Sequence, residues 1–298
     1  MQAALSSFSY TEIDGVDGHT VPVKALPHTP AVVGCWRAHM NVLQKIVHEN
    51  IATALVFEDD ADWDVSLKQQ LVQFARGSRV MINTTTTHPT CSPYGDNWDM
   101  LWIGNCGTGS RDEDHRRVFV IPRDPTAEPL QYRDDMYETP NMSRWEGGLQ
   151  GDHQTRIVFP SSKGVCTAAY GISQQGARKA LHYMGMVPYN HPVDLGFADL
   201  CAHDRYAYMC VSVFPPLIGF SRPAGHQSKN SDIEYGDELS GPVEDARSQH
   251  VVFSVRLNME RLLRGETVFE SQFPDVTGQQ MHIQDIGSAV GHVEIMPE

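Results

Sequence analysis

The sequence lacks long apolar runs and an excess of basic residues, and each shortage excludes a class of protein. No apolar stretch in the 298 residues approaches the ~18 that span a bilayer, so we expect no transmembrane segment. The first ten residues have neither a basic start nor a long apolar core, so we expect no signal peptide in this chain. With 23 basic and 37 acidic side chains the net charge is −14, which argues against a general nucleic-acid binder.

Several common site motifs are also missing. The six cysteines include no C-x-x-C pair, which disfavours a zinc knuckle or a thioredoxin-type site but leaves disulfides open. There is no phosphate-binding G-x-x-x-x-G-K-[ST], no G-x-G-x-x-G after a strand and no H-E-x-x-H. Asp60, Asp62 and Asp64 begin like a calcium loop, but Val65 replaces the required Gly and Leu71 the required Glu. The sequence therefore excludes these standard nucleotide, zinc-protease and calcium sites.

The composition and the order of the apolar patterns predict an α/β protein. Hydrophobic residues make up 41% and charged residues 20% of the chain, as in an ordinary folded globule. Apolar side chains recur at helical spacing over 35–50, and the short apolar run over 53–57 that follows predicts a buried strand. An acidic turn then leads into a second helix, which is the alternation typical of α/β folds. Further expected elements are a helix over 66–76, strands over 99–104, 117–121, 155–159 and 166–173, and a helix over 174–184.

Residues 58–64, called here the acidic segment, are the strongest functional signal. They hold five carboxylates in seven residues directly after an apolar strand. Like charges this close repel one another unless a cation or solvent compensates them. In an extended segment Glu58, Asp60 and Asp62 point the same way, so they could share a hard divalent cation such as Mn²⁺ or Mg²⁺. The alternative is a solvated charged turn that caps the next helix.

Four other side chains are candidates, each with a structural alternative. His39 lies near a helix start and could face a phosphate or a sugar hydroxyl, or could be packed beside the acidic segment. Asp194 could be a second metal ligand or a base, but a helix cap fits equally well. Asp99 is a strand-edge carboxylate with the same ambiguity. Cys35 is more typical of a core residue than of a nucleophile.

Six blocks in this order and spacing resemble glycosyltransferase family 25, which includes lipooligosaccharide and collagen hydroxylysine galactosyltransferases. The similarity is closest to fungal members and covers roughly residues 5–235. Each block alone is weak, and their combination carries the resemblance. The blocks are residues 13–18, 33–39, 55–60, 98–104, 166–177 and 192–194.

The resemblance implies a GT-A-like fold, which is a Rossmann-type α/β sheet flanked by helices that binds a UDP-linked sugar. The expected reaction moves galactose or glucose from that donor to a glycan or protein hydroxyl. The resemblance suggests the ER or Golgi lumen as the compartment, although this chain shows no signal or anchor, so the localisation stays open. The family's acidic motif corresponds to residues 58–60, which would bind Mn²⁺ (or Mg²⁺) and the donor diphosphate. The predicted site residues are Asp60 and Asp194 for catalysis, His39, Glu58, Asp59 and Asp99 for cofactor binding, and Glu58, Asp60 and Asp62 for the metal.

The sequence also departs from the family pattern. The strand and basic segment with which family members begin are absent before Leu5, so the sheet is expected to lack its first strand, and Ala38 replaces a common Ser. We expect a catalytic domain over 1–235 and a polar extension over 236–298 with one helix near 251–264. Two alternatives to a transferase remain open, namely a catalytically impaired, transferase-like binding protein and a metal-dependent phosphohydrolase.

Overall fold

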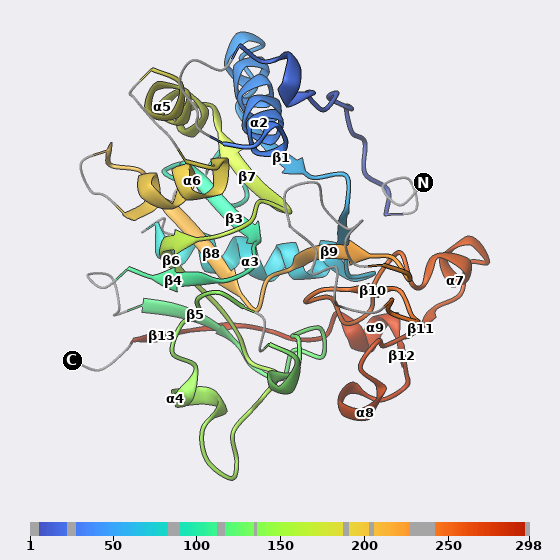
Figure 1. Cartoon of the computed structure of the whole chain (residues 1–298). Helices are drawn as coiled ribbons and strands as arrows, with labels where there is room; N and C mark the ends of the chain where they lie inside the picture. Colours follow the sequence, from blue (N-terminus) through green and yellow to red (C-terminus); the bar gives the residue numbers. More distant parts are fainter. Residues whose placement is uncertain are drawn as a thin grey trace.

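An eight-stranded mixed sheet runs through the centre of the molecule in the order β1-β7-β3-β8-β6-β5-β13, with β4 paired to β6 (Figure 1). The computed structural model describes residues 6–22, 28–82, 90–111, 117–133, 136–186, 191–202, 206–226 and 242–295. Strands β3 and β8 pair in parallel, whereas the other neighbours in this order pair antiparallel. The strands of this sheet are β1 (Thr53–Phe57), β3 (Met100–Gly104), β4 (Thr108–Ser110), β5 (Arg117–Ile121), β6 (Arg156–Gly164), β7 (Ala169–Ser173), β8 (Cys210–Phe214) and β13 (His292–Ile295).

Helices cover both faces of this sheet, which confirms the α/β expectation. Figure 1 shows α2 (Pro30–His48), α5 (Gln174–Gly185) and α6 (Val193–Ala202) together on one side. Side-chain alternation along β3 separates the two layers: Met100 and Trp102 pack with these three helices. Leu101 and Ile103 pack instead with α3 (Leu67–Met81) on the other face. The strand is buried throughout because both of its faces are covered.

The first long helix, α2, begins five residues earlier than its apolar pattern predicts. The Thr29 hydroxyl accepts a hydrogen bond from Val32 N at 3.5 Å, and Pro30 occupies the first turn, where a missing N–H costs nothing. The helix ends at His48, and Asn50 follows in the left-handed region with φ 55°. The predicted end at Asn50 is therefore right to within two residues. The helix start was placed too late, because the capping residue Thr29 precedes the apolar pattern.

Strand β1 forms one edge of the described sheet. Within the described residues it pairs with β7 alone, from Thr53 opposite Ser173 to Phe57 opposite Ala169. None of its five residues is fully buried, and Leu55 is 40% exposed. The expectation of a fully buried strand is wrong here, because a short apolar run does not distinguish a central strand from an edge strand.

The C-terminal part of the chain adds strands to the central sheet and to a second, three-stranded sheet in the order β10-β9-β2. β13 adds to β5, and β10 (Arg247–Ser248) pairs with β9 (Ile218–Arg222), which in turn pairs with β2 (Ala61–Trp63). Residues 251–255 are buried, and the expected helix over 251–264 shrinks to α7 (Met259–Leu263), because this apolar run packs as irregular chain. The predicted domain boundary at residue 235 lies outside the described residues. The remaining short elements are η1 (Gly18–Thr20), η2 (Leu130–Tyr132), α4 (Ser143–Glu146), β11 (Val268–Glu270), α8 (Pro274–Thr277), β12 (Gln280–His282) and α9 (Ile283–Ile286).

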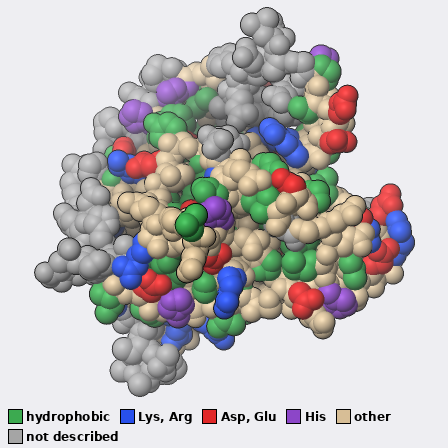
Figure 2. Space-filling view, turned by 90° about the horizontal axis from the view of Figure 1, so that it is seen from below, with side chains coloured by type: hydrophobic (Ala, Val, Ile, Leu, Met, Phe, Trp, Pro, Cys, Tyr) green, Lys and Arg blue, Asp and Glu red, His purple; other side chains and the backbone are tan. Residues whose placement is uncertain are grey.

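Among the helices that the structure describes, none is both long and apolar enough to cross a membrane. Figure 2 shows one face of the molecule, on which Lys and Arg side chains lie interspersed with Asp and Glu among the residues drawn in colour. No single sign of charge dominates this face.

Two disulfides cross-link the chain, and we expect them to differ in their contribution to stability. Cys106–Cys166 closes a loop of sequence separation 60, whereas Cys201–Cys210 has a separation of 9. In the chain-entropy account the first stabilises by about 4 kcal/mol and the second by about 3 kcal/mol, because the longer loop restricts the unfolded chain more. Urea unfolding of the two Ser/Ser double variants measures this. A larger loss for the short loop would contradict the expectation.

Candidate functional site

The acidic segment is not extended. After β1 ends at Phe57, the chain reverses within four residues, and the Ala61 N–H donates to the Glu58 carbonyl at 3.1 Å. It then enters β2, which pairs with β9. Because of this turn, Glu58, Asp60 and Asp62 do not share one direction as the sequence analysis expected. The three predicted metal ligands are therefore split into two groups.

Asp62 points into the protein and joins the acidic segment to the C-terminal chain. Its side chain is fully buried. Its Oδ2 accepts hydrogen bonds from the hydroxyls of Ser248 and Ser254, and its Oδ1 accepts from the backbone N–H of Trp63 at 2.8 Å. The Arg256 N–H lies 3.4 Å from the same oxygen. With these donors around both oxygens, Asp62 organises chain packing and is not placed to share a metal with Glu58.

Glu58 lies where α2, β1 and the chain before β7 meet. Its Oε1 accepts a hydrogen bond from the Thr167 hydroxyl and lies 3.3 Å from His39 Nε2. The other ring nitrogen of His39 is 2.9 Å from the Tyr170 hydroxyl. Burial raises the pKa of Glu58, but the hydrogen bonds and charges of His39, Thr167 and Arg222 outweigh it, so the pKa is lowered overall. Glu58 is thus a held, ionised carboxylate.

Asp60 lies in the same turn but is poorly compensated. Arg222 on β9 donates to its Oδ2 at 2.9 Å. Its Oδ1 is buried and accepts no hydrogen bond from the described residues. Burial and the neighbouring charge of Glu58 raise the pKa of Asp60 to about 6, against the lowering effect of Arg222. A buried carboxylate oxygen with no donor costs free energy that a bound cation would recover.

Asp194, at the start of α6, also lies near the C-terminal end of β1. Its Oδ2 accepts from the backbone N–H of Cys166 at 3.0 Å, next to the residue that donates to Glu58, and its Oδ1 accepts from Leu195 N at 2.8 Å. Cys35 on α2 lies close enough to Glu58 and Asp194 for their charges to affect its thiol. Burial, then Glu58 and Asp194, raise the pKa of the Cys35 thiol to about 12, so this thiol is not an activated nucleophile.

Two predicted cofactor-binding residues lie differently. Asp59 is exposed on the surface of the turn. Asp99 lies at the opposite end of the strands from Glu58. Strands β1 and β3 run in the same direction, because both are antiparallel to β7, and Asp99 precedes β3 whereas Glu58 follows β1. Its Oδ2 accepts from Lys179 at 2.7 Å and from Met209 N at 2.9 Å, although its buried Oδ1 has no donor among the described residues. The structure brings Glu58, Asp60, His39 and Asp194 together and leaves Asp99 outside.

The residues that hold these groups carry no motif from which their role could be predicted. Arg222 lies 162 residues after Asp60 in the sequence, in no recognisable motif. It reaches Asp60 because β9 pairs with β2. Thr167 and Tyr170 belonged to a block noted for its strand pattern. A readable signal did exist for Cys35, which is four residues before His39 on a predicted helix and so lies on the same face.

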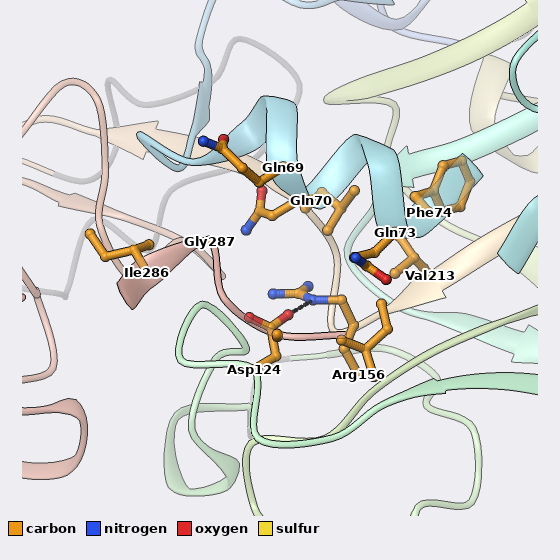
Figure 3. Close-up of a pocket in the computed structure, with 12 residues that line it drawn as sticks. Gln69, Gln70, Gln73, Phe74, Asp124, Arg156, Val213, Ile286 and Gly287 are labelled. Atoms are coloured by element: carbon orange, nitrogen blue, oxygen red, sulfur yellow. Dashed lines mark hydrogen bonds and ion pairs between the residues drawn. The ribbon is translucent and has the colours of Figure 1, made fainter. Parts of the chain in front are cut away.

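A separate pocket lies between α3 and the loop after α9 (Figure 3). Gln69, Gln70 and Gln73 project from α3 above the ion pair of Asp124 and Arg156. The Arg156 guanidinium is buried, and it donates to Asp124 at 2.7 Å and to backbone carbonyls nearby, so its charge is already matched. Its lining residues come from parts of the chain other than the acidic segment. The charged groups of this pocket pair with each other and have a structural role, and they are not part of the site at the acidic segment.

A search against models of known protein families found no match for this chain. The clustered side chains are therefore the basis for the chemistry of this chain. Two carboxylates of the turn, a third at the start of α6, an imidazole and a guanidinium lie near the C-terminal end of β1. Such a set can hold a divalent cation and can accept a proton from a hydroxyl.

Proposed function

We propose that the protein is a metal-dependent glycosyltransferase that moves galactose or glucose from a UDP-sugar to a hydroxyl of a glycan or protein. The observation that carries the proposal is the buried Oδ1 of Asp60, which has no hydrogen-bond partner among the described residues and lies beside the ionised Glu58. Two carboxylates in this arrangement form an oxygen site for a hard cation. The blocks that resemble family 25 supply the reaction class.

The donor set fits Mn²⁺ or Mg²⁺ through Glu58 and Asp60. Both offer carboxylate oxygens, and within the described part of the chain no donor reaches the buried Oδ1 of Asp60. Arg222 compensates one oxygen of Asp60 and leaves the other for a ligand. Asp62 is left out of the proposed metal site, because it is fully buried and turned toward the serine hydroxyls of the C-terminal chain.

The chain's own residues have distinct tasks in the proposed reaction. When bound, the cation would neutralise the charge that develops on the departing diphosphate. His39 and Thr167 hold Glu58 in place, and Arg222 holds Asp60. As the acceptor oxygen bonds to the anomeric carbon and the bond to the UDP oxygen breaks, Asp194 would take the hydroxyl proton at a carboxylate oxygen.

The architecture and the cysteines support the wider proposal of a GT-A-like protein of the secretory pathway. Helices on both faces of a large sheet, with the acidic segment following the carboxyl end of β1, are compatible with a nucleotide-sugar site at that edge. Disulfides persist mainly in oxidising compartments, and the chain has two of them. These features make the secretory lumen the proposed compartment.

Cation binding is expected to depend on pH through Asp60. The ionised carboxylate binds the cation, and the pKa of Asp60 is raised to about 6, so affinity should fall as the pH drops through about 6. The loss approaches tenfold per pH unit below that value. Electron paramagnetic resonance of free Mn²⁺ measures it. Arg222→Gln removes the charge that lowers this pKa, so its midpoint should move to higher pH, and an unchanged midpoint would contradict the assignment to Asp60.

A further inference from the structure

One face of α2 carries a cysteine and a histidine, side chains of the kind that ligate metals, which the proposed Mn²⁺ site does not use. Cys35 and His39 are one helical turn apart and face the end of β1, where Glu58 follows the strand. One potential ligand atom from each of the three residues lies within 4.8 Å of the other two. This is a sulfur, nitrogen and oxygen set contributed by two elements, which is a different chemistry from an acidic cluster.

The surrounding residues already orient this set. The Tyr170 hydroxyl lies 2.9 Å from His39 Nδ1, which leaves Nε2 turned toward Glu58 at 3.3 Å. The Thr167 hydroxyl donates to Glu58, and the His39 ring is 6% exposed. Partners of this kind on the far nitrogen of a histidine fix its ring orientation at metal sites. The ring and the carboxylate are therefore held before any ion arrives.

We propose that Cys35, His39 and Glu58 form a binding site for a borderline transition-metal ion of the Zn²⁺ type. Thiolate and imidazole ligands favour such ions over Mn²⁺ or Mg²⁺, which prefer oxygen. Tetrahedral bonds of about 2.0–2.3 Å place ligand atoms about 3.5 Å apart, so a set that now spans up to 4.8 Å has to contract by about 1 Å. On coordination the thiol proton passes to solvent, and water fills the fourth position.

This site shares Glu58 with the proposed donor site and differs from it in its other ligands. Asp60 belongs to the proposed donor site and has no part in the sulfur-containing set. Cys35 belongs to the sulfur-containing set and has no part in the proposed donor site. Variants of these two residues therefore separate a failure of one proposal from a failure of the other.

Cobalt substitution tests the site directly. Addition of Co²⁺ to the full chain is expected to produce a near-ultraviolet sulfur-to-cobalt charge-transfer band and intense visible bands typical of tetrahedral coordination, and excess Zn²⁺ should remove both. Cys35→Ser should abolish the charge-transfer band. Cys91→Ser is the matched control, because Cys91 is the exposed free cysteine, and it should leave the band unchanged. Tyr170→Phe should lower the Zn²⁺ affinity by about 10–100-fold through loss of the histidine's partner.

Each other result overturns the proposal. A folded chain that gives no charge-transfer band has no thiolate site. A band that survives in Cys35→Ser and vanishes in Cys91→Ser belongs to the surface cysteine. Asp60→Asn should keep the cobalt spectrum whatever its effect on UDP-sugar binding, and loss of the spectrum in a folded Asp60→Asn protein would merge the two sites into one.

Discussion

Replacement of Asp62 by alanine is expected to lower the free energy of unfolding by about 3 kcal/mol or more. Asp62 is fully buried and accepts hydrogen bonds from two serine hydroxyls and the Trp63 N–H. Removing the acceptor leaves buried donors unsatisfied at about 1–3 kcal/mol each. Ser248 and Ser254 lie 3.2 Å apart through their hydroxyl oxygens, so they can partly satisfy each other. The Trp63 amide has no such substitute among these groups.

Asp59→Ala is the matched control for this prediction. It removes a carboxylate three residues earlier in the same segment, but from an exposed side chain, so its effect should stay within about 0.5 kcal/mol. Chemical denaturation of both variants, with the slope compared to that of the unchanged protein, measures the difference. Equal stability of the two variants would mean that Asp62 does not anchor the C-terminal chain.

The variant Asp60→Asn is expected to lower the affinity for Mn²⁺ and the UDP-sugar together by about 100-fold, at least as much as the loss of an outer-shell partner of a metal ligand. Asparagine keeps the volume of the side chain and can still accept the hydrogen bond from Arg222, so the fold should persist. The substitution removes the negative charge that the cation needs. Titration calorimetry with UDP-galactose measures the loss, and circular dichroism checks the fold.

The variant Asp99→Asn tests at which end of the strands the donor binds. Asp99 precedes β3, and its carboxylate is paired with Lys179 at 2.7 Å. If the donor binds at the acidic segment, Asp99→Asn should bind UDP-galactose as the unchanged protein does. A loss equal to that of Asp60→Asn would place the donor at the other end of the strands, or would show that both variants act through stability.

Much of the fold could be predicted from local patterns. The helix after residue 173 and the strands β1, β3 and β5 lie where apolar periodicity and β-branched residues placed them. Those patterns did not show that β1 is an edge strand, because edge or centre depends on distant pairing. They also failed for residues 251–255, whose apolar run is buried as irregular chain against Trp63 and Asp64.

The acidic residues of the candidate site stand out in the sequence, whereas the residues that hold them in place do not. The charges of the acidic segment and the block around His39 were visible in the sequence, and the structure places Glu58, Asp60 and His39 together. The turn at 58–61 reversed the direction of Asp62, because alternation holds only while the chain stays extended. Arg222 comes from a strand 162 residues further along and could be found only through the β2–β9 pairing.

The most direct test of the proposed donor site is calorimetric titration of UDP-galactose and UDP-glucose into the chain with and without Mn²⁺. A cation held by Glu58 and Asp60 predicts binding of at least one donor with Mn²⁺, much weaker binding without it, and loss of this difference in Asp60→Asn. A demonstrably folded chain that binds neither donor in either condition would contradict the account. That result would favour a transferase-like protein without donor binding.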